Sequence, residues 1–295
     1  MKKNNKIISI ILFITIILLI ILIIITSRNN LSKEHFQTSF YDLPKIIWSY
    51  WDSDVLPEQI KLIYENNKKK LSDWDYRLVN NSNKKEYIGD DDIKKNLSKP
   101  HYADWIRLYL LKKYGGVWMD ISIIINDSIN DLFDKSISWK SELTAFSMPS
   151  FEDDTIDLPI IENYFIMAPK NSEIILLWYK EFNKAINQGF EEYKLEQIKN
   201  GVNFQNLAYD KVDIVYFTEH ACLQVVLQKK LNRAPNMYIE SGLNSMYKLQ
   251  NECGWNYKCL ITRINDKSYS KKIPYIKLRG EDRKKLDLTN YFRDD

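Results

Sequence analysis

The hydrophobic residues of this 295-residue chain form one unbroken run near its start and many short, interrupted patterns after residue 43. The run covers residues 7–26 and consists of Ile, Leu and Phe, interrupted only by Ser9 and Thr15 before Thr26. About 20 helical residues, each rising about 1.5 Å, cross the roughly 30 Å hydrocarbon core of a bilayer. The pattern therefore predicts a transmembrane signal anchor at residues 7–26.

A cleaved signal peptide is the alternative to this anchor. Signal peptides have an apolar run of about 7–15 residues followed by small residues, whereas this run is longer and residues 25–28 are a poor cleavage site. Three Lys residues precede the run, which favours a cytosolic tail at residues 1–6 by the positive-inside rule. Residues 27–42 are then expected to form a stem, and residues 43–295 a single domain.

Strand and helix patterns alternate from residue 43 onward. Residues 45–51 are β-branched and aromatic and predict a strand. Residues 102–114 have the clearest helical periodicity, and the glycine pair after them is expected to end that helix. Further strands are expected at residues 76–79, 117–119, 121–125, 143–148 and 164–167, and further helices at 173–188 and 220–230. This alternation predicts an α/β fold with a mostly parallel central sheet, whose ligands bind beyond the carboxyl ends of the strands.

Composition excludes several classes of protein. The net charge of +3 is spread through mixed-sign sequence, so no nucleic-acid partner is expected. Three Cys exclude a disulfide-dense scaffold, although Cys253 and Cys259 are able to pair if the domain is extracytoplasmic, leaving Cys222 in an apolar pattern. Three His and the absence of a C-x-x-C pair argue against a zinc site. Three tryptophans in apolar patterns are expected in the core: Trp118, Trp139 and Trp178.

The segment from residue 103 to residue 122 carries the candidate chemistry. Asp104 and Arg107 are three residues apart and therefore share one face of the predicted helix. Asp120 follows the first apolar stretch of the next strand, where a carboxylate can hold Mg²⁺ or Mn²⁺ and leave positions open for phosphate oxygens. Such an ion would stabilise a departing diphosphate. Each feature alone is typical of a surface ion pair, a turn or a helix cap, but their joint order and spacing indicate a site.

This segment resembles the DXD-type sugar-binding glycosyltransferases, in the broad relationship of glycosyltransferase family 32, and looks most like the branch of capsular polysaccharide synthesis proteins. Those proteins share the pattern S/A-D-x-x-R-x-x-x-L-x-x-x-G-G-x-[WY]-x-D, which residues 103–120 keep. The resemblance also includes the Leu-Pro-Lys-Ile-Ile of residues 43–47 and the strand pattern of residues 162–170. Residues 274–279 are similar only loosely.

The resemblance implies a GT-A type fold, a nucleotide-sugar donor, a glycan or glycoconjugate acceptor, and transfer with retention of anomeric configuration. It implies that Trp51 lies near the nucleotide base and that Asp104 and Arg107 contact the ribose, sugar and phosphates. Asp120 matches the first acid of the DXD motif, which acts on the donor and its metal, Mn²⁺ or Mg²⁺. The expected catalytic residues are Asp104, Arg107 and Asp120; the expected donor-binding residues are Trp51, Asp104, Arg107, Gly116 and Lys277; and the expected metal ligands are Asp120 and Ser122.

The chain departs from the motif at Ser122, which stands where the second acid is expected. A hydroxyl is a weaker metal ligand than a carboxylate. Three alternatives are open. Ser122 ligates the metal through its hydroxyl or through a water, Asp127 contributes a ligand in its place, or the metal dependence or the activity is reduced. Lys277 and Arg279 form either a C-terminal clamp on the diphosphate or a solvated tail, and the Glu-His pair at residues 219–220 is either part of the site or an ordinary helix start.

The sequence thus predicts a membrane-anchored glycosyltransferase, with a catalytically silent glycan- or nucleotide-binding protein of the same fold as the alternative. A phosphohydrolase needs further clustered carboxylates or His, which the sequence does not show. A double displacement needs a carboxylate nucleophile, and no residue is singled out for it. The expected topology is type II with a lumenal, Golgi-like or extracytoplasmic domain; in a bacterium the domain would face the cytoplasm, where nucleotide sugars are made.

Overall fold

The computed structural model describes residues 41–147, 158–204 and 215–293. The predicted cytosolic tail, the predicted anchor at residues 7–26 and all but the end of the predicted stem lie outside these described residues. Within the described ranges, no helix is both long and apolar enough to span a bilayer. The described residues from 42 onward belong to one compact unit.

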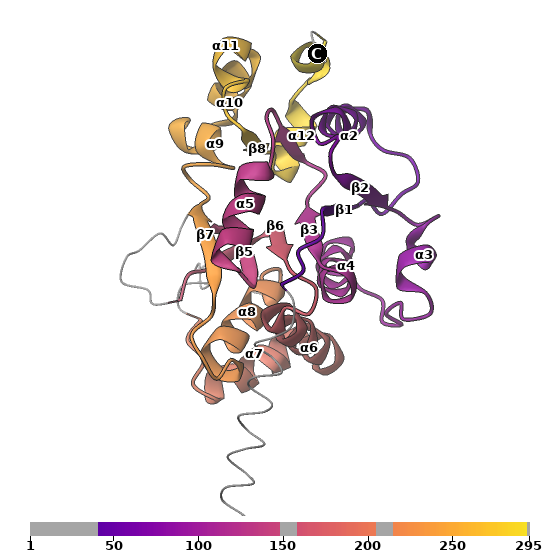
Figure 1. The fold of residues 1–295 in the computed structure, drawn as a ribbon, viewed down its shortest axis with the longest axis vertical. Coiled ribbons are helices and arrows are strands. Elements are labelled where there is room, and N and C mark those ends of the chain that lie inside the picture. Colours follow the sequence, from indigo (N-terminus) through magenta and orange to yellow (C-terminus); the bar gives the residue numbers. More distant parts are fainter. Residues whose placement is uncertain (1–40, 148–157, 205–214, 294–295) are drawn as a thin grey trace, which may run out of the picture. The chain divides into compact units, whose positions relative to one another are not determined.

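The main sheet of this unit has the strand order β2-β1-β3-β6-β5-β7 (Figure 1). Its strands are β1 (Ile46–Tyr50), β2 (Asp75–Val79), β3 (Gly116–Met119), β5 (Leu143–Ser147), β6 (Ile161–Ala168) and β7 (Met237–Ser241). β1 pairs in parallel with β2 and β3, and β5 with β7, whereas β6 runs antiparallel between β3 and β5. Only β6 among these strands opposes the common direction, so the predicted α/β class with a mostly parallel sheet is confirmed.

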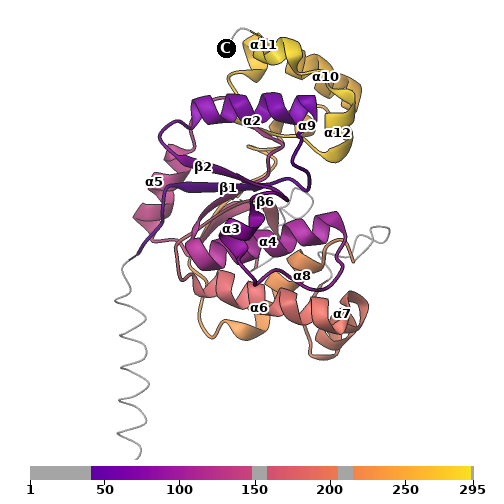
Figure 2. The ribbon, with the colours of Figure 1, turned by 90° about the vertical axis from the view of Figure 1, so that its right-hand side faces the viewer.

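Helices lie on both sides of the sheet (Figure 2). On one side α4 packs on β1 and β3 and against α6, which packs against α8, while α2 lies on the other side. The helices before the C-terminal segment are α2 (Glu58–Lys70), α3 (Lys84–Ile88), α4 (Lys99–Tyr114), α5 (Asn130–Trp139), α6 (Glu173–Gln188), α7 (Phe190–Lys199) and α8 (Thr218–Val225), which continues into the π-helix η3 (Val226–Lys230). The predicted helices at residues 102–114, 173–188 and 220–230 are thereby confirmed, the last one in two geometries.

The glycine pair after α4 is required by its surroundings. Gly115 ends the helix with a φ of +69°, and its N–H donates to the Leu111 carbonyl. Gly116 has a φ of +96°, and a Cβ there would lie 2.5 Å from the carbonyl oxygen of Ile46 on β1. Glycine readily adopts such positive φ values and lets two backbones approach closely. The pair therefore turns the chain sharply from α4 into β3.

A second, two-stranded sheet joins the motif to the C-terminal segment. β4 (Ile123–Ile125) pairs antiparallel with β8 (Tyr275–Lys277), with Ile123 opposite Lys277. The strand predicted at residues 121–125 starts at Ile123 because residues 120–122 form a turn, in which the Ile123 N–H donates to the Asp120 carbonyl at 3.0 Å. The C-terminal helices are α9 (Lys248–Glu252), α10 (Tyr257–Asn265), α11 (Lys267–Ser270), α12 (Gly280–Lys285) and α13 (Thr289–Phe292).

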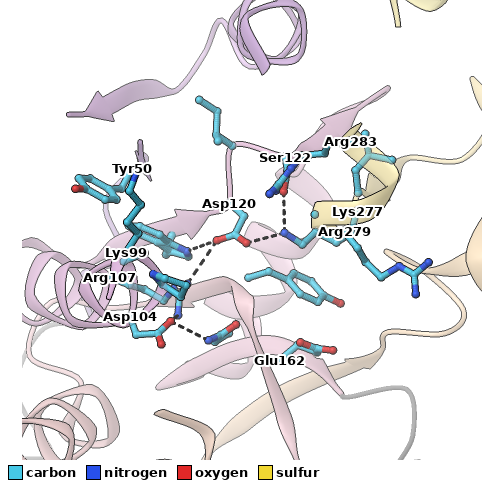
Figure 3. A pocket seen from close by; sticks show the side chains of 18 of the residues that line it. Tyr50, Lys99, Asp104, Arg107, Asp120, Ser122, Glu162, Lys277, Arg279 and Arg283 are labelled. Carbon is cyan, nitrogen blue, oxygen red and sulfur yellow. Dashed lines mark hydrogen bonds and ion pairs between the residues drawn. The ribbon is translucent and has the colours of Figure 1, made fainter. Parts of the chain in front are cut away.

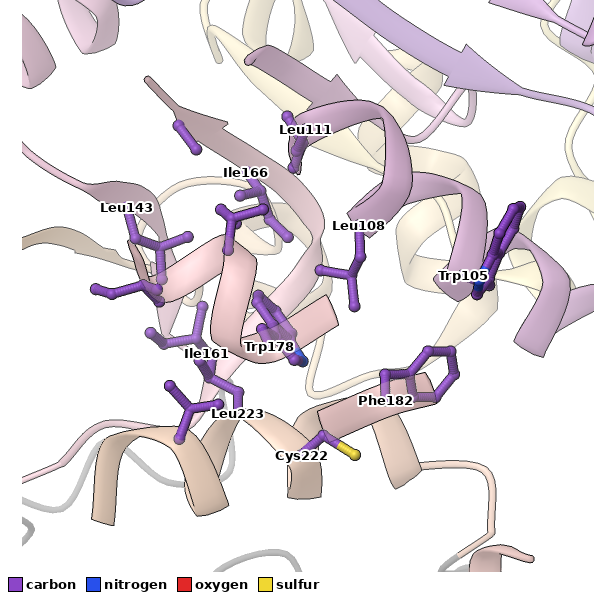
Figure 4. Close-up of a cluster of buried hydrophobic side chains, with 14 of the residues drawn as sticks. Trp105, Leu108, Leu111, Leu143, Ile161, Ile166, Trp178, Phe182, Cys222 and Leu223 are labelled. Atoms are coloured by element: carbon purple, nitrogen blue, oxygen red, sulfur yellow. The ribbon is translucent and has the colours of Figure 1, made fainter. Parts of the chain in front are cut away.

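The main core lies between the sheet and the α4–α6–α8 layer (Figure 4). It includes Trp105, Leu108, Leu111, Leu143, Ile161, Ile166, Trp178, Phe182, Cys222 and Leu223, all buried. Trp118 and Trp178 are buried as predicted, but the prediction for Trp139 is wrong: it ends α5 and is 61% exposed.

A second core cluster fixes the C-terminal segment. Ile63 of α2 packs with Ile124 of β4, Ile276 of β8 and Tyr291 of α13. Burial of apolar area stabilises such contacts by about 25 cal/mol per Å². The C-terminal segment is thus a packed layer that holds β8 beside the end of β3.

Candidate active site

One cleft of about 750 Å³ opens where the carboxyl ends of β1 and β3 meet α4, α8 and the β8–α12 segment (Figure 3). Parallel α/β sheets bind ligands at this edge. Its lining includes Tyr50, Trp51, Lys99, Asp104, Arg107, Trp118, Asp120, Ser122, Glu162, Asn163, Tyr164, Tyr216, His220, Tyr247, Trp255, Lys277, Arg279 and Arg283. All the predicted site residues except Gly116 therefore meet in one cleft.

Arg107 is the centre of a buried charge network. Its guanidinium donates to Asp104 at 2.9 Å and to Glu219 on α8, and lies 3.5 Å from Asp120. It also stacks over the Trp118 ring at 4.9 Å. Burial alone would lower the pKa of Arg107, but the carboxyl groups of Glu219, Asp104 and Asp120 raise it. Arg107 is thus a fixed cation that holds three acidic side chains in place.

Glu219 and Asp104, which both pair with Arg107, also share one hydrogen-bond donor. The Asn163 side-chain amide donates to Glu219 at 2.6 Å and to Asp104 at 3.3 Å. Burial raises the pKa of Glu219 well above its ordinary value, and burial also raises the pKa of Asp104. Burial disfavours the charged carboxylates, so these two acids retain protons to higher pH than exposed ones, although Arg107 opposes the shift.

Asp120 leaves the end of β3 with both carboxylate oxygens engaged. Its Oδ1 accepts from Trp118 Nε1 at 3.0 Å and faces Arg107, while its Oδ2 accepts from Lys277 Nζ at 2.6 Å. Its backbone N–H donates to the Tyr164 carbonyl at 2.8 Å, which fixes the strand end. Burial would raise the pKa of Asp120, but Lys277 and Arg107 lower it below its ordinary value. Asp120 is therefore an anion between two cations.

The expected metal ligands are occupied by a side chain of the protein. Lys277 Nζ contacts both Asp120 Oδ2 and Ser122 Oγ, the second at 2.8 Å (Figure 3). The described residues contain no group of three or more His, Cys, Asp or Glu side chains arranged to hold a metal. Asp127, the alternative ligand, is exposed and does not line the cleft. The residues present therefore do not fit the predicted divalent ion.

The C-terminal segment adds cations to the cleft. Arg279 and Arg283 line it beside the buried Lys277, so this segment is not a solvated tail. The Arg279 guanidinium is held by Asp282 at 3.0 and 3.1 Å and lies 5.1 Å from the centre of the Trp255 ring. This wall of the cleft is suited to a ligand with several negative charges.

Gly116, predicted to contact the donor, does not line the cleft. Its place is the opposite end of β3 from Asp120, against Ile46. Trp51, by contrast, does line the cleft, directly after β1 and beside Tyr50. The structure thus gives Gly116 a role in packing and brings Trp51 to the site.

Two titratable residues of the cleft were not predicted as site residues. Glu162 is the second residue of β6, and burial raises its pKa to about 8. His220 is buried, neither of its ring nitrogens has a partner among the described residues, and burial together with Arg107 lowers its pKa to about 3. Glu162 precedes an ordinary strand pattern, and the helix start at His220 has an equally ordinary explanation. No local signal marked Glu162, whereas His220 belongs to the Glu-His pair for which a place in the site was one of the two alternatives.

A protein family and a glycosyltransferase are similar to this chain. The family described as capsular polysaccharide synthesis protein matches residues 23–273. The O-glycosyltransferase PaGT of Phomopsis amygdali is 34% identical over 84 residues, which are 28% of this chain and 20% of that protein.

Two solved structures are similar at low sequence identity. A glycosyltransferase involved in the glycosylation of the major capsid of PBCV-1 is 13% identical, with 82% of this chain and 98% of that one covered, at a TM-score of 0.44. The glycosyltransferase GlyE of Streptococcus pneumoniae TIGR4 is 10% identical, with 86% and 60% covered, at a TM-score of 0.41.

Proposed function

Because the chain belongs to the family of capsular polysaccharide synthesis proteins, we propose that it is a glycosyltransferase that moves a sugar from a nucleotide-sugar donor to a glycan or glycoconjugate acceptor. The observation that carries this proposal is the convergence of Asp104, Arg107 and Asp120 in one cleft at the carboxyl ends of β1 and β3. These three residues are already close in sequence. The structure adds to them a cationic wall of the cleft, which comes from the distant C-terminal segment.

The two walls of the cleft suit the two parts of such a donor. Lys277 and Arg279 offer positive charge to the diphosphate, which stabilises the negative charge that develops as it departs. Trp51 lines the cleft and offers an aromatic ring for the base. Asp120 and Glu162 offer oxygen acceptors for hydroxyl groups of the sugar. We assign the fold to the GT-A type because the cleft suits a nucleotide-sugar donor in these ways.

Transfer with retention is the reaction that the family resemblance implies. A same-face displacement, in which the leaving phosphate takes the acceptor proton, needs no protein nucleophile. A double displacement needs a carboxylate. Among the described residues, Glu162 and Asp52 are partly buried cleft acids outside the Arg107 network, and Asp52 is paired with Lys99 at 2.5 Å, so Glu162 is the better candidate. Trapping of a glycosylated Glu162 in rapid-quench experiments with donor alone would favour the double displacement.

The proposed location is a membrane-anchored domain on the lumenal or extracytoplasmic side. The disulfide between Cys253 and Cys259 supports this side, since disulfides persist in oxidising compartments and are rare in the cytosol. The anchor at residues 7–26 remains a proposal from the sequence. Protease protection of the domain in sealed vesicles tests the orientation, and carbonate extraction tests the anchor.

A catalytically silent binding protein is the second candidate, because Lys277, Arg107 and Trp118 already engage the Asp120 carboxylate. The test is a panel of nucleotide sugars incubated with the full-length protein in detergent, with binding and hydrolysis followed together. Turnover of one donor supports the transferase, binding without turnover supports the silent protein, and no binding of any donor contradicts both.

A further inference from the structure

Lys277 holds the position at which the DXD motif expects a divalent ion. We propose that the Lys277 ammonium is a built-in counter-cation, so that the protein binds the diphosphate of its donor and transfers the sugar without a divalent metal. This inference deepens the proposed function and rests on it. It assigns to Lys277 a direct contact with the phosphate groups.

The contacts at the ammonium are those of a filled cation site. Lys277 Nζ lies 2.6 Å from Asp120 Oδ2 and 2.8 Å from Ser122 Oγ, so one group uses both expected ligand atoms. Mg²⁺ needs oxygen ligands at about 2.0–2.1 Å in near-octahedral geometry. An ion that binds Asp120 Oδ2 and Ser122 Oγ would have to expel the ammonium.

The charges around Asp120 oppose a second cation. Arg107 lies 3.5 Å from Asp120 Oδ1, on the other side of the same carboxylate. With Lys277 at Oδ2, the Asp120 carboxylate already faces two cations, of which Arg107 is shared with Asp104 and Glu219. Like charges a few ångströms apart repel strongly in a buried site. A neutral Ser122 adds no negative charge to offset this, whereas a second acid would.

The backbone fixes the Lys277 side chain at this position. Its strand β8 pairs with β4, which follows Ser122 directly, and the Leu278 N–H donates to the Ser122 carbonyl at 3.2 Å. The Lys277 N–H donates to the Met246 carbonyl at 2.9 Å, and the Gln250 side chain donates to the Lys277 carbonyl at 2.5 Å. Lys277 is 6% exposed. The ammonium is therefore part of the fold, as a preorganised charge must be.

The ammonium can also serve a phosphate. It has three N–H donors, and Asp120 and Ser122 accept two of them. The third donor is available to a phosphate oxygen in the cleft, which Lys277 lines together with Arg279 and Arg283. Lys277, Arg279 and Arg283 place three cations on one wall against the two acids Asp120 and Asp282 that pair with the first two, so the wall keeps a net positive charge for a diphosphate, whose charge a divalent ion balances in DXD enzymes.

The first test compares metal conditions on the unaltered full-length protein in detergent, with UDP and GDP as probes. We expect the better-bound nucleotide to have the same Kd in excess EDTA and in excess Mn²⁺, within about twofold, and the electron spin resonance signal of Mn²⁺ to show no bound ion. Binding that weakens about tenfold or more in EDTA, with a bound Mn²⁺ signal, would overturn the inference and leave the proposed function standing. If neither nucleotide binds in either condition, the proposed function fails and this inference fails with it.

The second test removes the ammonium. Lys277→Met keeps the length of the side chain and should weaken nucleotide binding about 10- to 100-fold in both metal conditions, the loss expected for a charge-assisted hydrogen bond. Lys277→Ala should recover part of the binding when propylammonium is added. Lys272→Met, at an exposed Lys before β8, is the matched control and should bind as the unaltered protein does. Unchanged binding by a folded Lys277→Met variant would contradict the inference.

Discussion

Arg107 of α4 and Glu219 of α8 form a buried ion pair across 112 residues of sequence. Neither side chain is more than 4% exposed. The pair connects the motif helix to a helix that the sequence motif does not include. Together with the hydrogen bond from Trp178 Nε1 to the Glu219 carbonyl, it holds α8 and its His220 against the cleft.

Loss of this pair should destabilise the domain. Glu219→Ala leaves the Arg107 guanidinium short of one buried partner, and removal of one member of a buried ion pair costs about 3–5 kcal/mol. We expect a decrease of about 3 kcal/mol in the free energy of unfolding, measured by urea denaturation. Glu65→Ala, at an exposed position of α2, is the control and should change it by less than about 0.5 kcal/mol. Equal effects of the two changes would contradict the network.

Gly116→Ala should destabilise the fold without touching the cleft. The new Cβ would lie 2.5 Å from the Ile46 carbonyl oxygen, at a φ of +96°. Gly89→Ala is a matched control, because Gly89 also has a positive φ, +68°, but no atom lies within 4 Å of the added Cβ. We expect about 1 kcal/mol for the strain in Gly89→Ala and at least about 1–2 kcal/mol more for Gly116→Ala. A Gly116→Ala variant that is stable but selectively loses donor binding would instead support the donor contact that the sequence predicts for Gly116.

Glu162 should make stability depend on pH. Burial raises its pKa from 4.5 to about 8, with Lys277 and Arg107 opposing the shift and Asp120 adding to it. Between these two pH values the folded chain holds a proton that the unfolded chain has lost, so this group lowers the free energy of unfolding as pH rises through the window.

The corresponding variant is Glu162→Gln, which removes the titration. Between about pH 5 and pH 8 its free energy of unfolding should fall less than that of the unaltered protein, by up to about 3–4 kcal/mol at about 1.4 kcal/mol per pKa unit. Thermal unfolding across this range measures the difference, and Glu65→Gln should leave the profile unchanged. If stability depends on pH in the same way in all three proteins, folding does not raise the pKa of Glu162.

The disulfide should stabilise the segment that carries Trp255. Cys253 and Cys259 are six residues apart, and closing so short a loop is worth about 2 kcal/mol in the chain-entropy account. Cys253→Ser and the double variant with Cys259→Ser should lose this amount equally. Mass spectrometry of thiols in protein isolated from its own cells checks the compartment, because two alkylated cysteines at these positions would contradict the extracytoplasmic proposal.

Local patterns were enough to predict the part of the site that lies on consecutive elements. Asp104 and Arg107 share a helix face by spacing alone, and the glycine pair indicated the turn that delivers Asp120 to the cleft. The alternation of strands and helices was likewise sufficient for the α/β class, since parallel strands need helical crossovers.

Contacts between distant segments were beyond such patterns. Lys277 was expected near the donor, but its contact with Asp120 joins residues 157 positions apart and depends on the pairing of β8 with β4. Glu162 became a cleft residue through the antiparallel insertion of β6 beside β3. Trp139 misled because the apolar residues that α5 buries, Leu132 and Phe133, lie in its first half, whereas Trp139 at its end is exposed. The roles of the individual site residues remain predictions.

The measurement that tests the central claim most directly is hydrolysis of the best nucleotide sugar by the full-length protein and by Asp120→Asn, with Asp127→Asn as the matched control. We predict that Asp120→Asn loses turnover about 100-fold or more, as loss of a preorganised charge at a reacting centre does, while the exposed Asp127→Asn retains it. Equal turnover by a folded Asp120→Asn would contradict a transferase site at the end of β3.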